Sequence, residues 1–429
     1  MENILTHSFN PVQLLLSILG YLAPIPLSVL ALHLWHHYRQ EEFMTKLKWT
    51  LLEIHVPRDV VKSPAAMELI FNNAFGHKTR GDFWGKYIIG VVPAWFSLEI
   101  ISRGGNVHFL IRVQTAMRDL VENQIYAQYP QAKVIEVADY VYDIPTLTDD
   151  SEWDVWACEY TKEKEDFYPI KTYNDFGEDL RTGIKEEFKI DPITSTIEYM
   201  GSLPKGQELW MQIVIRDGEK KYHSHKKNAH VGFYQASAEF MNDLIQKYAD
   251  EGKTEANPKP RAQALPEPLK STVEAINRQI NKSHFDVGIR VVTLSNKKLC
   301  SGQQFGNLVR DSRLIFNQYS QKNINSLKRV NATGFDMPWN DPTGQGIIKY
   351  KNRSLDFYRL RTFFNPPLQY STDHPKIIQA FFPTGSPKPF VFSSEELATL
   401  FHFPGMVSET PTFKRIESKI AKPPANLPI

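Results

Sequence analysis

The clearest structural signal in the chain is WFSLEIISRGGNVHFLIRV, residues 95–113. It contains two apolar runs, 95–102 and 107–113, on either side of a turn that holds Gly104-Gly105. A glycine pair between two such runs is typical of a β-hairpin. We therefore expect the two runs to be neighbouring antiparallel strands.

Three ionisable residues lie on this predicted hairpin: Glu99, His108 and Arg112. Alternation along a strand that has one solvated face places such residues on the solvent side. We therefore expect them to have no functional role.

The segments on both sides of the hairpin complete a predicted α+β unit. WTLLEIHV (49–56) and AKVIEV (132–137) have the alternation of strands. Ser63-Pro64 can begin a helix before the hairpin, and Thr115 can cap a second helix after it. The resulting order, βαββαβ, predicts a ferredoxin-like domain over residues 48–143. This architecture serves many unrelated functions, so it predicts a shape and no chemistry.

A second set of strands predicts a mixed α/β sheet unit over residues 144–385. Strands are expected at 153–160, 209–215 and 285–295, and the continuously apolar middle one should be central in its sheet. Residues 249–269 are rich in proline and charge and predict an excursion from this unit.

The last segment, 386–429, is expected to contain a short helix and an extended linker. Ser393 and Glu396 have the spacing of a capping box that opens this helix. The predicted fold class is therefore α+β, with a second sheet unit after the ferredoxin-like one.

The N-terminal part predicts a transmembrane helix in front of these units. After a flank, 1–11, residues 12–35 carry no formal charge. At about 1.5 Å per residue they are long enough to cross a hydrocarbon core of about 30 Å. A cleaved signal peptide is the competing interpretation, but the flank contains Glu2 and neither lysine nor arginine.

Basic residues follow this span and none precedes it. Arg39 and Lys46 lie in the juxtamembrane segment 36–47, which predicts an N-terminus outside the cell membrane and a cytoplasmic bulk. Trp35, Tyr38 and Arg39 are expected at the membrane interface, with the lipid bilayer as a partner.

The formal net charge of +2 conceals two opposed segments. Residues 139–191 contain 16 Asp or Glu against 6 Lys or Arg, a net of −10. Residues 270–329 contain 11 Lys or Arg against 3 Asp or Glu, a net of +8. Three interpretations stay open: the segments neutralise each other within the chain, they dock one subunit onto another, or the basic one contacts phosphates.

Candidate phosphate contacts come from the loop 217–230 and from the basic segment. They are Lys220, Lys221, Lys226, Lys227, Arg310, Arg313, Lys328 and Arg329. An exposed loop and an ordinary salt-bridged helix are the competing interpretations. The histidines of the loop lack carboxylate partners in sequence, so no metal site is predicted.

Known catalytic motifs are missing from the sequence. It contains no G-x-x-x-x-G-K-[ST], and EGKTE (251–255) lacks the earlier glycine that a phosphate-binding loop needs. G-x-S-x-G and H-E-x-x-H do not occur either. The two cysteines, Cys158 and Cys300, are too few for a disulfide framework or a zinc site. We expect no enzyme activity, no catalytic residue and no cofactor.

Several segments together resemble a known family. They are WFSLEIIS, QIYAQYP (124–130), STIEYMGSLPKGQELWMQI (195–213), EELATLFHFPG (395–405) and RIESKIAKPPANLP (415–428). This combination resembles the membrane-anchored N-terminal region of bacterial conjugation-type, type IV secretion-like coupling ATPases. In that family the region is a domain of unassigned function that precedes a hexameric DNA-translocating motor. No motor residue is carried over, because the chain lacks the phosphate-binding loop.

The resemblance implies a non-catalytic adaptor of a DNA-translocation assembly that works with a motor ATPase on another chain. Other secretion-assembly subunits are further expected partners, while direct DNA contact and homo-oligomerisation stay open. The alternative is a tethered protein–protein scaffold without nucleic-acid contact. An unrecognised enzyme is a third hypothesis.

Overall fold

The structure is a computed structural model. It describes residues 20, 24–57, 62–76, 82–177, 191–218, 220–224, 227–251, 267–334, 341, 344–365 and 388–404.

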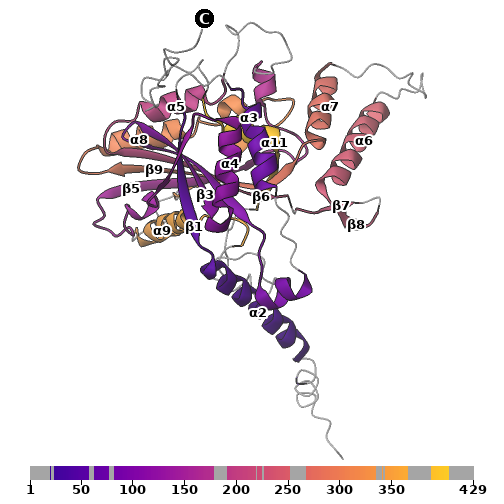
Figure 1. The fold of residues 1–429 in the computed structure, drawn as a ribbon, viewed down its shortest axis with the longest axis horizontal. Coiled ribbons are helices and arrows are strands. Elements are labelled where there is room, and N and C mark those ends of the chain that lie inside the picture. The colour runs from indigo at the N-terminus through magenta and orange to yellow at the C-terminus, as the bar shows by residue number, and fades with distance from the viewer. Residues whose placement is uncertain are drawn as a thin grey trace, which may run out of the picture.

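One antiparallel sheet of nine strands organises the described residues (Figure 1). Its strand order is β10-β5-β9-β6-β2-β3-β1-β4, and β11 pairs with one end of β9. The strands are β1 (Trp49–His55), β2 (Trp95–Arg103), β3 (Asn106–Gln114), β4 (Lys133–Val137), β5 (Trp153–Lys162), β6 (Gln207–Asp217), β9 (His284–Asn296), β10 (Leu327–Val330) and β11 (Phe390–Ser393).

The two halves of the sheet repeat one topology. The first half runs β1-α3-β2-β3-α4-β4 and has the strand order β4-β1-β3-β2. The second runs β5-α5-β6-β9-α8-β10 and has the order β10-β5-β9-β6, so each strand occupies the equivalent place. The helices are α3 (Ala65–Ile70), α4 (Arg118–Gln128), α5 (Thr194–Gly201) and α8 (Gly302–Ser312).

The halves differ in the connection between their second and third strands. In the first half, β2 and β3 are joined by the tight turn at Gly104-Gly105, where both glycines have positive φ. In the second half, the corresponding connection includes β7 (Tyr222–Ser224), β8 (Ala229–Val231), α6 (Phe233–Glu251) and α7 (Glu267–Ile280). These elements project to one side of the sheet (Figure 1).

Residues 49–137 contain the strands predicted for the first unit, but the predicted fold class is wrong because the two units share one sheet. Strands β2 and β6 pair antiparallel from Trp95 opposite Arg216 to Arg103 opposite Glu208. Both strands are buried on both faces for most of their length, as their nearly continuous apolar sequences require. The prediction that 209–215 is a central strand is confirmed.

The predicted transmembrane helix is also wrong. Among the described residues, no helix combines the length and apolarity that crossing a membrane requires. Helix α2 (Pro24–Lys46) continues past Trp35 into a polar turn that contains Glu41 and Glu42. The predicted single-pass localisation is therefore wrong as well. Of the predicted span, residues 12–19 and 21–23 lie outside the described residues.

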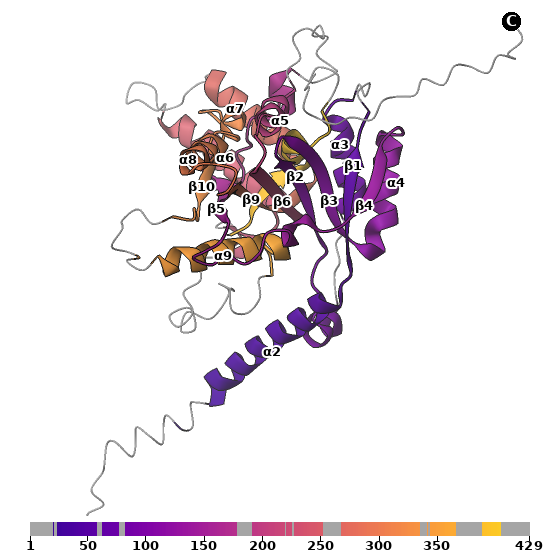
Figure 2. The same cartoon turned by 90° about the vertical axis from the view of Figure 1, so that its left-hand side faces the viewer.

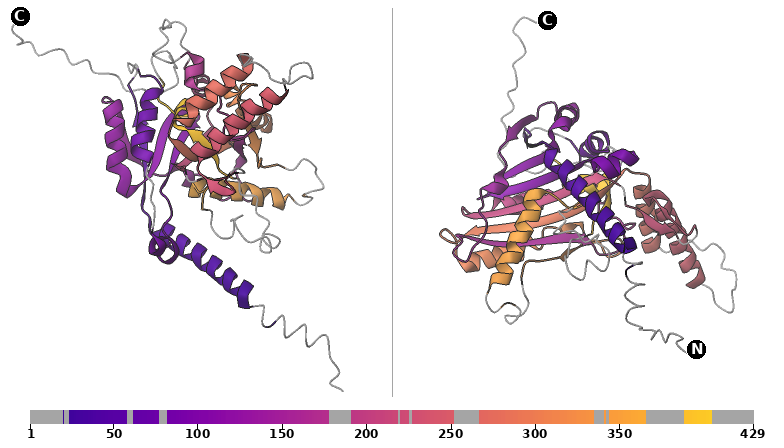
Figure 3. Two further views of the ribbon diagram at one scale, coloured as in Figure 1. Left: turned by 90° about the vertical axis from the view of Figure 1, so that its right-hand side faces the viewer. Right: turned by 90° about the horizontal axis from the view of Figure 1, so that it is seen from below.

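Helices cover the sheet unequally. Helices α3, α4, α5, α8 and α11 (Ser394–Leu400) pack on one face, where they enclose the largest hydrophobic core. The opposite face carries α9 (Gln345–Leu360), which packs over Trp210 and Val292. Figures 2 and 3 show α9 and α2 on this second side, with α2 projecting away from the domain. We call this side the α9 face.

Candidate functional site

A row of buried polar residues crosses the α9 face. The strand registers place Glu99 on β2 opposite Gln212 on β6, Gln212 opposite Arg290 on β9, and Arg290 opposite Glu159 on β5. Arg290 donates from Nε to Glu159 Oε1 (2.9 Å) and from Nη1 to the carbonyl of Phe357 in α9 (3.2 Å). The row therefore joins the two halves of the sheet and attaches α9 to them.

Arg361 completes this row immediately after α9. Its guanidinium donates to both Glu99 oxygens (2.8 and 3.1 Å) and to Asp139 Oδ1 (2.8 Å). The Arg361 and Glu99 side chains are both 0% exposed. Burial raises the pKa of Glu99, but the charge and hydrogen bonds of Arg361 outweigh it, so the carboxyl pKa lies below its ordinary value. Arg361 and Glu99 therefore form a buried ion pair.

Two tyrosines contact the Glu99 end of this row. Tyr140 donates to Glu99 Oε2 (2.8 Å), and its hydroxyl lies 2.7 Å from that of Tyr358 in α9. Burial, followed by the charge of Glu99, raises the pKa of both tyrosines well above the ordinary value. Each charged group of the row has a partner inside the fold, so the row holds the sheet and α9 together.

A groove opens beside this row, where α2, the sheet and the end of α9 meet. Its volume is about 690 Å³, within the range of small-molecule sites. Its principal lining residues are Met44, Trp49, Trp95, Arg112, Arg359 and Thr362. We call it the Arg112 groove.

Arg112 lies on the α9 face because it is two residues from Leu110, which packs in the core under α9. Its guanidinium stacks 4.2 Å from the centroid of the Trp49 ring. Burial lowers the pKa of Arg112 to about 10, and the nearby Arg361 charge adds to this effect. Among the described residues, the guanidinium has no hydrogen bond or ion pair.

Trp95 lines the same groove with its ring. It is 7% exposed, and its indole nitrogen is buried inside the fold, without an acceptor among the described residues. The rings of Trp95 and Trp49 lie 4.7 Å apart between centroids. The groove thus combines an aromatic wall with an unpaired cation.

An exposed apolar surface lies at the same end of the molecule. It is formed by α2, whose exposed apolar side chains point to all sides of the helix, and by residues 83–89, which include the short π-helix η2 (Gly85–Ile89). We call it the α2–η2 surface; its large exposed side chains are Ile25, Leu27, Val29, Leu32, Leu34, Trp35, Tyr38, Phe83, Trp84, Tyr87, Ile88 and Ile89. These are twelve of the nineteen exposed large hydrophobic side chains among the described residues.

A comparison with family models places most of this fold in one family. The model for a domain of unknown function, DUF8128, matches residues 94–415. The chain belongs to the DUF8128 family. No curated protein matches it. In this DUF8128 protein the folded unit begins before the match, because β1 (Trp49–His55) lies between β3 and β4 in the sheet.

The candidate phosphate contacts of this DUF8128 protein do not form one site. Lys220 is paired with Asp166, and Lys221 and Lys227 are exposed near the β7–β8 hairpin. Lys226 lies outside the described residues. The hairpin is on the opposite side of the domain from α8, which carries Arg310 (Figure 1).

The remaining candidates lie around α8 and the edge strand β10. Arg310 donates to Asp311 (2.8 Å), and Arg313 stacks over Trp156 at 5.4 Å. Lys328 and Arg329 are exposed on β10. Arg313 and Arg329 both act electrostatically on the buried Cys158, so this group is compact.

The two oppositely charged segments meet inside the chain. Ion pairs join Arg278 to Asp175, Arg290 to Glu159, Lys297 to Asp154 and Lys298 to Glu152. Of the three interpretations left open by sequence, internal neutralisation therefore accounts for at least part of the charge.

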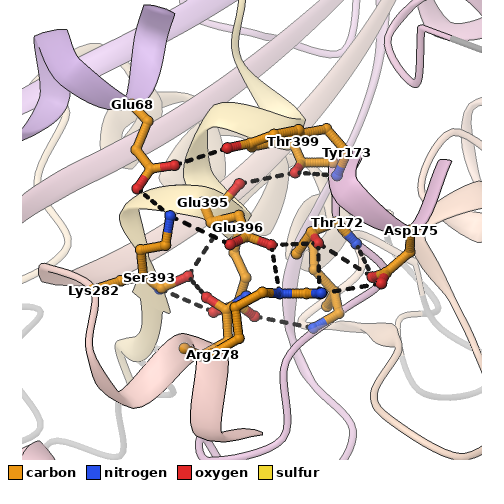
Figure 4. Close-up of polar contacts among 12 residues, drawn as sticks. Glu68, Thr172, Tyr173, Asp175, Arg278, Lys282, Ser393, Glu395, Glu396 and Thr399 are labelled. Carbon is orange, nitrogen blue, oxygen red and sulfur yellow. Dashed lines mark hydrogen bonds and ion pairs between the residues drawn. The ribbon is translucent and has the colours of Figure 1, made fainter. Parts of the chain in front are cut away.

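A second polar cluster surrounds α11 on the opposite face of the sheet (Figure 4). The Ser393–Glu396 capping box is confirmed, and Glu395 is fully buried. Glu395 faces Arg278 at 3.1 Å, while Glu396 pairs with the buried Lys162 at 2.8 Å. The cluster anchors α11 to the neighbouring elements.

Sequence reasoning missed Glu99 and Arg112, which it placed on a solvated face. Glu99 is buried, and Arg112 is half-buried in the groove. His108 is half-buried and bonds to Glu53 (2.7 Å). The available signal was the continuous apolar run around Glu99, which is typical of a strand covered on both faces.

The three residues predicted at the membrane interface lie on α2. Trp35 and Tyr38 are exposed on the α2–η2 surface, and Arg39 pairs with Glu42. Within the described ranges, no three metal-binding side chains cluster together.

Proposed function

We propose that this DUF8128 protein is a non-catalytic adaptor that binds another protein of a DNA-translocation assembly through the α2–η2 surface. The observation that carries the proposal is the concentration of exposed apolar side chains on α2 and η2. Large exposed apolar areas mark interaction sites. Burying one large side chain contributes about 1.5–3 kcal/mol, so a few of them can hold a partner.

The surface is preformed because α2 is fixed against η2. Arg39 Nε donates to the carbonyl of Ile88 (2.5 Å), and the rings of His36 and Tyr87 lie 5.2 Å apart. Gly90 has φ +80°, and its backbone packs against that of Arg39. A rigid surface loses little conformational entropy on binding, which favours a stable complex.

A motor ATPase on another chain is the partner that the family resemblance suggests. The resembling segments include 95–102 in β2, 195–213 around β6 and 395–405 at α11. These segments form the body of the domain, and the α2–η2 surface projects from it (Figure 2). In this proposal the sheet domain holds the α2–η2 surface in place, and that surface binds the partner.

The test measures complex formation between the purified chain and the coupling ATPase of the same organism by sedimentation velocity. We expect Leu32→Glu with Trp84→Glu to abolish the complex, because both side chains lie on the α2–η2 surface, with exposures of 69% and 64%. The matched control is Leu299→Glu with Leu314→Glu, whose side chains are similarly exposed elsewhere, at 66% and 58%. A complex that survives the first pair, or that never forms, contradicts the proposal.

The second candidate function is a protein–protein scaffold without nucleic-acid contact. The ion pairs between residues 139–191 and 270–329 favour it, because they occupy basic groups that would otherwise face phosphates. Duplex DNA binding measured from low to high salt separates the two: phosphate contact predicts a steep loss of affinity with salt. If Arg313, Lys328 and Arg329 contact DNA, their joint replacement by glutamine should flatten this slope.

A further inference from the structure

We propose that the Arg112 groove is a binding site for a small organic anion with a flat apolar body. The inference concerns a surface other than the α2–η2 surface, and it holds whether or not that surface binds a motor.

The first argument is the unpaired charge of Arg112. Arg290 and Arg361, on the same face of the sheet, each have a carboxylate partner within 2.9 Å. Arg112 is half-buried, and among the described residues its guanidinium stacks on the ring of Trp49 without a hydrogen bond or ion pair. An anion in the groove would give its guanidinium the partner that the other two arginines have inside the fold.

The second argument is the kind of partner that a guanidinium takes. Arginine pairs most strongly with planar or tetrahedral oxyanions, which it can bind through two parallel N–H groups. The anionic group is therefore a carboxylate or a phosphate.

The third argument is the shape and polarity of the walls. Trp49 and Trp95 form an aromatic side, and Met44 of α2 and Leu360 of α9 add apolar surface. Cavities of about 690 Å³ accept a ligand of one or two rings with its substituents. The ligand therefore needs a flat or apolar body in addition to its anionic group.

Further charges fix the orientation of the ligand. Arg359 adds positive charge, but its guanidinium is already held by Asp356 and by the carbonyl of Ile144. Glu41 of α2 contributes a carboxylate to the opposite wall. We expect the anionic group to lie at Arg112 and the apolar body to extend along the tryptophans.

The test uses 1-naphthoate as the probe and isothermal titration calorimetry on the full chain. Uncharged 1-naphthamide is the control ligand, since it keeps the rings and loses the charge. We expect naphthoate to bind at least about tenfold more tightly than naphthamide, as a desolvated charge-assisted contact requires. A parallel titration with 1-naphthyl phosphate distinguishes a carboxylate site from a phosphate site.

Matched variants locate the binding. Arg112→Met should weaken naphthoate by about tenfold or more and leave naphthamide nearly unchanged. Arg313→Met is the control, because Arg313 also stacks on a tryptophan, Trp156, but lies outside the groove.

Two further results decide between the groove and other surfaces. Leu32→Glu with Trp84→Glu should leave naphthoate affinity unchanged if the probe enters the groove rather than the α2–η2 surface. Equal affinities for naphthoate and naphthamide would overturn the proposal. So would naphthoate binding that Arg112→Met does not weaken, or no detectable binding of either anionic probe.

Discussion

Arg361 and Arg112 lie on the same face of one sheet and have opposite surroundings. Arg361 is 0% exposed and meets Glu99 and Asp139, whereas Arg112 meets a tryptophan ring and a groove. Burying a charge is costly unless a partner is supplied. The difference teaches that the fold supplies the partner for Arg361 itself, while the Arg112 guanidinium is left open to the groove in which we propose an anion binds.

The largest expected effect comes from removing the paired arginine. Arg361→Met leaves the Glu99 carboxylate buried and alone, which typically costs about 3–5 kcal/mol of the free energy of unfolding. Urea unfolding followed by circular dichroism measures the loss. Glu99→Gln with Arg361→Met should recover part of it, because the fully buried carboxylate is gone and only the partly exposed Asp139 loses its partner. If Arg361→Met lowers the free energy of unfolding only slightly, Arg361 and Arg112 do not differ in their importance for the fold.

Acid pH should remove part of the same stabilisation. The pKa of Glu99 is lower in the folded chain, so its contribution is present above the unfolded-state pKa of about 4.3. That contribution is lost as pH falls through the lower folded pKa. The stability difference between the wild type and Glu99→Gln, measured by urea unfolding, should therefore be largest at pH 6 and shrink below about pH 4. A difference independent of pH would mean that Glu99 is not ionised in the folded protein.

Local patterns predicted the separate elements of the fold better than their assembly. The hairpin at 95–113 and the capping box at Ser393 depend on residues close in sequence, and both are present. The burial of Glu99 depends on Arg361, which lies 262 positions later and adopts a left-handed conformation (φ 47°) that sequence rarely signals outside glycine.

The groove was still harder to predict. It joins Met44, Trp95, Arg112 and Thr362 from α2, two strands and the segment after α9. Alternation within one strand shows which residues share a face, but it does not show what covers that face. For this reason Arg112 was assigned to solvent.

A smaller effect should follow from loosening the α2 wall of the groove. Gly90 has φ +80°, and a Cβ there would lie 2.3 Å from the Arg39 carbonyl carbon. Gly90→Ala should lower the free energy of unfolding by about 1–2 kcal/mol and displace α2. Thermal unfolding and naphthoate titration measure the two consequences.

Gly302→Ala is the control for that substitution. Gly302 opens α8, and a Cβ added there would meet no neighbouring part of the described chain within 4 Å, so alanine should be neutral or slightly stabilising. If both alanines have the same effect, close packing at Gly90 does not hold α2 in place.

The smallest expected effect on stability is that of Arg112→Met. The contact with Trp49 contributes about 0.5–1 kcal/mol, but the substitution also ends the desolvation of an unpaired charge. These two terms oppose each other, so the free energy of unfolding should change by less than about 0.5 kcal/mol. Arg313→Met, which removes a similar contact with Trp156 from an exposed arginine, should behave similarly under the same urea titration.

The ligand should separate these two silent substitutions. A ligand that binds only the folded chain raises its apparent stability by RT ln(1 + [L]/Kd), where [L] is the free ligand concentration. With naphthoate present, wild type and Arg313→Met should therefore gain the same stability, and Arg112→Met should gain less. If Arg112→Met instead destabilises the ligand-free protein as strongly as Arg361→Met, then Arg112 stabilises the folded state, as Arg361 does.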